Sequence, residues 1–371
     1  MAEPVKGGLS VTLRQDGPIP LDLSLSCGAN EIVALVGPSG SGKTTILRSI
    51  AGLYKPAHGR IEYEGDCWFD AASGQCWPAQ RRRVGFVFQD YALFPNLTAS
   101  GNVEAALGHL PRGERAARAK ALLDQVNMGG LGARWPEQLS GGQCQRTAVA
   151  RALARDPTIL LLDEPFSAVD QVTRRRLQGE LLVLHRNIAA PVIFVTHDLR
   201  EATSIASRMA VLHRGSILQI GPPSEIFAHP ASPTVTRLLD LPNLFEAVVH
   251  GASQDGQITL LDWCGQLIEA KANKNVAAGE KVHWMVPQSS VILHRRGRPS
   301  RGERENPVSG SIEDTLVFGD QTTVLLRADL APELPLTFTI STHAARRNGL
   351  ERGVDATVSL VSEDIHIMTS G

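Results

Sequence analysis

GPSGSGKT at residues 37–44 decides the fold of this chain. Every fixed position of a phosphate-binding loop is filled, with glycines, a lysine and a hydroxyl at the required spacing. The apolar run EIVALV at 31–36 precedes the loop and is typical of a buried strand, and the residues at 44–50 are typical of a helix. A strand, a loop and a helix in this order predict an α/β fold that binds nucleotide phosphates.

The chemistry of the loop follows from its residue types. Its glycines let backbone N–H groups turn inward at a helix N-terminus, where the helix dipole adds positive potential. Lys43 is placed to reach the β- and γ-phosphates, and the Thr44 hydroxyl is placed to hold Mg²⁺. The predicted nucleotide-binding residues are Gly37, Pro38, Ser39, Gly40, Ser41, Gly42, Lys43, Thr44 and Thr45.

Two acids follow a second apolar strand at 159–162. Asp163 would emerge at the carboxyl edge of a parallel sheet, where such sheets bind ligands, and could hold the water shell of a metal. Glu164 lies one residue further and could polarise a water for attack on the γ-phosphate. A third apolar strand at 192–196 delivers His197 to the same edge, where it is either a cap or a catalytic contact.

The segment LSGGQ at 139–143 narrows the family. By itself it reads as a helix start capped by Ser140, and a glycine-rich helix N-terminus is also an anion site. Together with the phosphate loop, Gln89 and His197, the segment closely resembles the ABC ATPase family. The resemblance covers roughly residues 9–240.

The resemblance implies roles for further residues. The signature of one subunit would contact the nucleotide held by a partner subunit, and SAVD at 167–170 would cross the dimer interface. Residues implied to act in trans are Ser140, Gly141, Gly142, Gln143 and Asp170. The implied catalytic residues are Glu164, His197 and Gln89, and the implied Mg²⁺ ligands are Thr44, Gln89 and, through water, Asp163. The implied cofactors are ATP and Mg²⁺.

One departure from the family concerns the base of the nucleotide. The family stacks an aromatic ring on adenine from a strand before the phosphate loop, but residues 1–53 contain no Phe, Trp or Tyr. Arg14 lies in the corresponding region, and a guanidinium plane can also stack on a base. Arg14 is therefore a hypothesis for the adenine contact.

The chain of 371 residues is long enough for two or three domains. We expect an ABC ATPase domain at 1–240, with a helical subdomain at 90–135. Short alternating strands after that predict an all-β, OB-like barrel domain at 241–371. A faint repeat, with 279–293 parallel to 353–367, suggests two barrel-like units within it, at 243–294 and 306–369.

Composition predicts where the protein works. Lys and Arg number 37 against 38 Asp and Glu, which gives no basic excess to suggest nucleic acid as a partner. The five cysteines lack metal-ligand spacing and fit a reducing, cytosolic compartment. The first residues lack an apolar signal core, and no apolar run could span a bilayer. Any role at a membrane would therefore act through partner subunits.

The β-rich tail resembles the regulatory domains of bacterial import ATPases. This resemblance implies a homodimer at the cytoplasmic face of the inner membrane, bound to two transmembrane permease subunits and fed by a periplasmic solute-binding protein. The run from Phe69 to Asp90 and the tail are most similar to molybdate-importer ATPases. Sulfate, ferric iron and polyamine importers have similar tails and stay open as alternatives.

Three other classes of protein share some of these motifs. A soluble ABC ATPase of repair or translation would carry two cassettes or a long coiled-coil insertion, whereas this chain has one phosphate loop and one signature. A P-loop kinase or GTPase would lack the segment at 139–143. An oxyanion-responsive regulatory ATPase not coupled to transport stays open.

Overall fold

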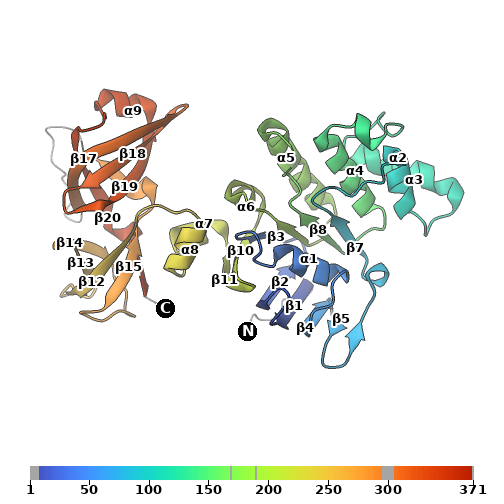
Figure 1. The fold of residues 1–371 in the computed structure, drawn as a ribbon, viewed down its shortest axis with the longest axis horizontal. Coiled ribbons are helices and arrows are strands. Elements are labelled where there is room, and N and C mark those ends of the chain that lie inside the picture. Colours follow the sequence, from blue (N-terminus) through green and yellow to red (C-terminus); the bar gives the residue numbers. More distant parts are fainter. Residues whose placement is uncertain (1–7, 168, 189, 295–304, 370–371) are drawn as a thin grey trace. The chain divides into compact units, whose positions relative to one another are not determined.

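The computed structural model describes residues 8–167, 169–188, 190–294 and 305–369 (Figure 1). The N-terminal residues 1–7, on which the expectation about a signal segment rested, lie outside these ranges. The chain divides into two compact units, Met1–Ser224 and Glu225–Gly371.

The first unit is built on one eleven-stranded sheet in the order β6-β5-β4-β1-β2-β11-β10-β3-β9-β8-β7. The pairs among β10, β3, β9, β8 and β7 are parallel, and β1, β4, β5 and β6 extend the other end as antiparallel strands. The strands are β1 (Gly8–Gln15), β2 (Leu21–Gly28), β3 (Ile32–Val36), β4 (His58–Tyr63), β5 (Asp66–Asp70), β6 (Gln75–Cys76), β7 (Val84–Val87), β8 (Ile159–Asp163), β9 (Val192–Val195), β10 (Arg208–His213) and β11 (Ser216–Gly221).

The interior strands β3, β8 and β9 are buried along their whole length. Continuous apolar runs of this kind are what a parallel sheet covered on both faces requires. The α/β fold predicted from the phosphate loop and these runs is thereby confirmed.

Helices of the first unit cover the sheet and form a separate group beside it (Figure 1). The separate group consists of α2 and α3, which lie within 90–135, and of α4, which packs against both. The helices are α1 (Lys43–Ala51), α2 (Ala99–Ala106), α3 (Arg112–Gln125), α4 (Gly141–Leu153), α5 (Gln171–Ile188) and α6 (Leu199–Ile205), with the 3₁₀ turns η1 (Ala79–Arg81) and η2 (Pro136–Gln138). Helix α7 (Pro223–Ala228) begins in the first unit and ends in the second.

The C-terminal end of α1 is held by a buried arginine. The guanidinium of Arg82, which is 2% exposed, donates to the carbonyls of Ser49 at 2.7 Å and Ile50 at 3.0 Å. It also donates to the carbonyl of Trp77 at 3.0 Å. Because a buried charge is tolerated only when its donors are satisfied, these bonds fix α1 in place behind the phosphate loop.

The second unit contains two five-stranded antiparallel sheets, β14-β13-β12-β15-β21 and β16-β20-β17-β18-β19. The predicted all-β character is confirmed, with helices only at α8 (Pro233–Leu238) and α9 (Thr342–Arg347) among its described residues beyond α7. The strands are β12 (Leu244–Ala252), β13 (Ile258–Trp263), β14 (Gln266–Lys271), β15 (Lys281–Met285), β16 (Val291–Leu293), β17 (Glu305–Phe318), β18 (Gln321–Ala328), β19 (Ala331–Ser341), β20 (Asp355–Val361) and β21 (His366–Thr369), with the 3₁₀ turns η3 (Gln288–Ser290) and η4 (Ser362–Asp364).

The faint sequence repeat appears as two strand–turn–strand segments that exchange their last strands. β15 leads through η3 to β16, and β20 leads through η4 to β21. After each turn the chain changes sheet, so that β16 pairs with β20 and β21 pairs with β15. The two turns are joined by a 2.7 Å bond from Ser290 Oγ to Asp364 Oδ2. The expected ranges 243–294 and 306–369 therefore each contribute a strand to the other's sheet.

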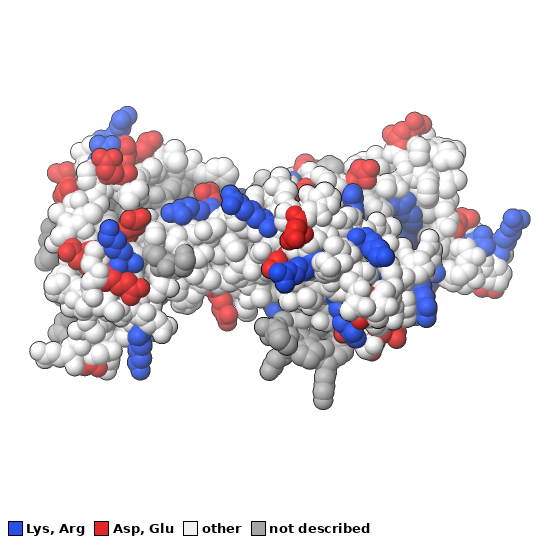
Figure 2. Space-filling model, turned by 60° about the horizontal axis from the view of Figure 1, so that its bottom comes forward, with Lys and Arg blue, Asp and Glu red and all other residues white. Residues whose placement is uncertain are grey.

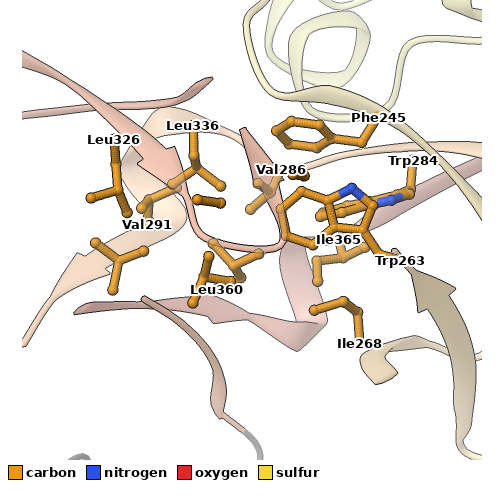
Figure 3. Packing of buried hydrophobic residues seen from close by; sticks show 14 of the residues in the cluster. Phe245, Trp263, Ile268, Trp284, Val286, Val291, Leu326, Leu336, Leu360 and Ile365 are labelled. Carbon is orange, nitrogen blue, oxygen red and sulfur yellow. The ribbon is translucent and has the colours of Figure 1, made fainter. Parts of the chain in front are cut away.

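A single apolar core joins the two sheets (Figure 3). Phe245, Trp263 and Trp284 cluster at one end, with ring centroids 4.9–5.3 Å apart. Val286 and Ile365 lie between this cluster and the leucines of the other sheet (Figure 3). Because Val286 precedes η3 and Ile365 follows η4, the exchange of strands is what makes the core continuous.

Two further features concern the polarity of the described helices and of the surface. Every helix within the described ranges is too short or too polar to span a lipid bilayer. On the face shown in Figure 2, acidic and basic side chains are interspersed, in keeping with a formal net charge of −1.

Candidate functional site

Four neighbouring parallel strands bring the predicted site residues to one edge of the sheet. In the order β3-β9-β8-β7, the strands are followed by the phosphate loop, by His197, by Glu164 and by Gln89. Asp163 is the last residue of β8. Since the carboxyl ends of parallel strands share an edge, residues up to 160 positions apart in the sequence become neighbours here.

The phosphate loop has the backbone that its glycines predict. Gly37, Gly40 and Gly42 have φ values of 150°, 80° and 96°, and Gly42 caps α1 in the left-handed conformation. A Cβ on Gly37 would lie 2.2 Å from the carbonyl oxygen of Leu212, whereas a Cβ on Gly40 would meet open space. Gly37 thus lets the loop approach β10, and the outer part of the loop stays open to a ligand.

Lys43 is enclosed by its own loop. Its Nζ donates to the carbonyls of Gly37 at 2.8 Å and Pro38 at 2.9 Å. Burial lowers the pKa of Lys43, and the nearby carboxylates of Glu164 and Asp163 act in the opposite direction. The ammonium is therefore held at the centre of a ring of backbone dipoles, where a phosphate would find a positive charge.

The two strongest candidates for holding Mg²⁺ are in direct contact. Thr44 Oγ1 donates to Asp163 Oδ1 at 3.1 Å. Burial raises the pKa of Asp163, and the hydrogen bond from Thr44 opposes that rise. A hydroxyl and a carboxylate are the hard oxygen ligands that Mg²⁺ prefers, so this pair fits the predicted cation.

Glu164 lies between the other two predicted catalytic residues. Its Oε2 is 3.3 Å from Gln89 Nε2 and 3.3 Å from His197 Nδ1. The backbone of Glu164 is in the left-handed region at φ 45°, and its N–H donates to the carbonyl of Val195 at 3.1 Å. The carboxylate that follows this turn contacts both neighbours, and 22% of the Glu164 side chain stays exposed to solvent.

The signature segment starts α4 as predicted from its capping pattern. Ser140 Oγ accepts from Gln143 N at 3.3 Å, and Gln143 Oε1 accepts from Ser140 N at 2.9 Å. Ser140 is exposed, and its hydrogen bonds within the described part of the chain stay at its own helix start. Gly142 is buried against α5, since a Cβ there would lie 3.0 Å from Thr173 Cγ2.

Asp170 starts α5 in a similar way. Its Oδ1 accepts from the backbone N–H groups of Val172 and Thr173, both at 3.0 Å. Hydrogen bonds from Thr173 lower the pKa of this exposed carboxyl. Ser140 and Asp170 therefore precede two helices, α4 and α5, that contact each other. These hydrogen bonds of the two side chains are not to the phosphate loop of their own chain.

Two neighbours of the phosphate loop were not foreseen in the sequence. The turn between β10 and β11 supports the loop, because Gly215 N donates to the carbonyl of Ser41 at 3.2 Å. Ile19, which is 37% exposed, places Cγ2 3.8 Å from where a Cβ on Gly42 would lie. Arg14, the residue proposed for the adenine contact, lies exposed within β1, paired with Asp22.

Taken together, the sheet, the loop and the paired acids define a P-loop ATPase. A family model described as ABC transporter matches residues 21–167. The chain is 44% identical over 237 residues to a sulfate/thiosulfate import ATP-binding protein of Thermosynechococcus vestitus, covering 63% of this chain and 68% of that protein. It is 36% identical over 344 residues to a Fe(3+) ions import ATP-binding protein of Rhizobium meliloti, covering 92% of this chain and 85% of that protein.

A solved structure is also similar. A dimeric, post-hydrolysis state of the ATP-binding cassette MJ0796, bound to ADP and Pi, matches with a TM-score of 0.50 and 32% identity over 58% of this chain and 98% of that chain. The chain therefore belongs to the ABC transporter family, as the ATP-binding subunit of an importer, and it is an ATPase. The family predicted from the signature segment is confirmed. The two relatives are named for sulfate or thiosulfate and for ferric iron, and neither name supports the molybdate expected from the sequence.

Proposed function

We propose that two copies of this chain hydrolyse ATP in two shared sites and thereby drive the uptake of a small solute. The observation that carries the proposal is the position of Glu164 between Gln89 and His197, beside the Thr44–Asp163 pair. In this arrangement the Glu164 carboxylate can accept a proton, while the Asp163 carboxylate accepts a hydrogen bond from the Thr44 hydroxyl. Hydrolysis of a phosphoanhydride needs this division of roles.

Each of these residues has a separate role in the hydrolysis of the terminal phosphate. Backbone N–H groups at 37–44 and Lys43 bind the phosphates, and Mg²⁺ held near Thr44 and Asp163 supplies charge neutralisation when bound. Glu164 accepts the proton of an attacking water, and His197 and Gln89 hold its carboxylate in place.

The other half of the site comes from the second copy. Ser140 is exposed at the start of α4, and its side chain bonds to the start of its own helix and not to its own phosphate loop. We place Ser140, with Gly141, Gly142 and Gln143, against the γ-phosphate bound by the partner, and Asp170 at the interface. The similarity to a dimeric cassette supports this arrangement.

Coupling to a permease would use residues 91–103. Asn102, which is fully buried, accepts from Phe94 N at 2.8 Å and donates to the carbonyls of Phe94 and Leu97, both at 3.1 Å. The folded segment leaves the Phe94 side chain 49% exposed. We propose that this segment contacts a permease subunit at the cytoplasmic face of the inner membrane, so that the two copies contact two permease subunits. A periplasmic binding protein would deliver the solute to these permeases. The import function in the relatives' names supports this.

For the solute, we propose a small oxyanion, with molybdate first and sulfate second. Ferric iron and polyamine are the alternatives, and the ferric-iron relative supports iron because its similarity extends over the C-terminal unit. A regulatory ATPase not coupled to transport has one observation in its favour. A cavity of about 810 Å³ beside α9 is lined by His343, Arg346 and Arg347, and none of the described residues that line it is acidic.

Uptake in cells tests the import function. In a strain lacking this chain, uptake of labelled molybdate is expected to fall to background and to return with the wild type but not with Glu164→Gln. Labelled sulfate and ferric iron, measured in parallel, serve as controls. If the strain lost only sulfate uptake, or only iron uptake, that solute and not molybdate would be the one transported. Unchanged uptake of all the candidate solutes, with ATPase activity intact, would contradict import and favour the regulatory class.

The base contact gives a second test, in which Ile19 takes the place of Arg14. The Ile19 side chain lies next to the start of α1 and is partly exposed, so an adenine ring could cover it. Ile19→Ala is expected to weaken ATP binding about 3- to 10-fold, the effect of removing one or two methyl or methylene groups from a contact that excludes water. Arg14→Ala is expected to leave it unchanged. Calorimetry with ATP measures both, and inorganic tripolyphosphate, which has no base, should bind equally to all variants. A loss confined to Arg14→Ala would restore the original assignment.

A further inference from the structure

A cavity of about 470 Å³ lies between α4 and α5, and residues 37–44 of the phosphate loop do not line it. The C-terminal end of α3 closes one side, and the end of β8 lies at its base. Its walls are mostly apolar, with Val149 from α4 and Leu177, Leu181 and Leu184 from α5. This volume and lining are typical of sites for small organic molecules.

One wall of the cavity carries a buried polar group without a partner. Gln145, on α4, lines the cavity and is 4% exposed. Its Oε1 accepts no hydrogen bond from the described residues. A buried acceptor left unpaired costs free energy, and a ligand with an N–H or O–H group would remove that cost.

The charged residues at the cavity are already paired with one another. Arg146 Nε lies 2.9 Å from Glu180 Oε2, and Arg176 Nε lies 3.2 Å from Glu180 Oε1. The hydrogen bonds from Arg146 and Arg176 both go to Glu180 Oε1. Among the described side chains that line the cavity, the buried acceptor without a hydrogen bond is Gln145 Oε1.

We propose that this cavity binds a small, apolar molecule that carries one N–H or O–H donor. The apolar body would pack on Val149, Leu177 and Leu181, and the donor would bond to Gln145 Oε1. No charge on the ligand is needed, because the guanidinium groups of Arg146 and Arg176 both form ion pairs with Glu180.

Occupancy would act on the nucleotide site through the two helices. α4 begins beside Ser140 and α5 beside Asp170, and the helices touch where Gly142 meets Thr173. The ligand would lie one to two turns further along both helices, so it would change how Ser140 and Asp170 are presented to a partner. This effect on ATPase activity rests on the proposed function, whereas binding to the cavity does not.

Indole is a suitable probe, because it is flat, apolar and carries one N–H. We expect saturable binding of indole to the full chain without nucleotide, measured by calorimetry and by shifts of leucine and valine methyl NMR signals. Indene, of the same shape without the N–H, is the matched ligand. Gln145→Met, which keeps the side-chain length but removes the acceptor, is expected to weaken indole about tenfold and to leave indene unchanged.

A variant that fills the cavity provides a second test of the proposed binding site. Leu181→Phe is expected to abolish binding of indole and indene together. If that variant does not fold, nuclear Overhauser contacts between indole and the methyl groups of Leu177 and Leu181 in the wild type decide the location. Absence of saturable binding, an equal affinity of indole for Gln145→Met, or contacts elsewhere would each overturn the proposal. ATPase activity measured with and without indole then reports separately on the coupling.

Discussion

Glu164→Gln is expected to lower the ATP turnover rate about 10²- to 10⁴-fold while ATP still binds, since an amide cannot accept the proton of the attacking water. Glutamine keeps the length and shape of the side chain, so the neighbours Gln89 and His197 can stay in place. ATP bound without turnover should hold two copies together. Phosphate release, ATP affinity and molecular mass in solution measure the three consequences.

The matched control is the same chemical change on an exposed acid of α3. Glu114→Gln removes a carboxylate far along the chain from the sheet edge and should keep the wild-type rate. A Glu164→Gln variant that turns over within a few-fold of wild type would remove Glu164 from the role of general base. His197 would then be the next group to test, because its Nδ1 lies 3.3 Å from the same carboxylate oxygen.

Ser140→Arg is the second change with a large expected effect. The residue is exposed and its hydroxyl serves only its own helix start, so the chain should fold and should bind ATP at its own phosphate loop. A bulky cation at the start of α4 would keep the signature from closing over the partner's γ-phosphate. Loss of such preorganised donors costs turnover about 10²- to 10³-fold.

The control for Ser140→Arg is an arginine elsewhere on an exposed position of the same subdomain, such as Glu137→Arg in η2. That variant should keep its activity. Calorimetry should give the same ATP affinity for both variants and for wild type. Weaker ATP binding by monomeric Ser140→Arg would mean that the signature acts within its own chain.

Much of the site could be predicted because its chemistry is local in the sequence. The loop at 37–44 needs its glycines for left-handed backbone and close approach, so composition and geometry are linked directly. Asp163, Glu164 and His197 follow apolar strands, and parallel strands deliver such residues to one edge. Capping by Ser140 was visible for the same reason, since Ser140 and Gln143 complete their bonds within four residues.

The parts that could not be predicted depend on contacts between distant segments. β10 and β11 lie beside β3 and β2, so the turn that carries Gly215 reaches the phosphate loop from more than 170 positions away in the sequence. Ile19 gave no signal, because a partly exposed isoleucine is ordinary in any sequence. The exchange of β16 and β21 between sheets was equally hidden, because a repeat reveals similar segments and not their pairing.

Mixing two inactive variants tests the shared site most directly. Lys43→Ala removes the phosphate-binding ammonium, and Ser140→Arg blocks the signature, so each variant alone should lack turnover. A mixed dimer keeps one site with an intact Lys43 on one copy and an intact Ser140 on the other. Random pairing with two-fold symmetry therefore predicts recovery of about a quarter of the wild-type rate. Mixed dimers with no activity, or full-rate hydrolysis by a strictly monomeric wild type, would contradict the account.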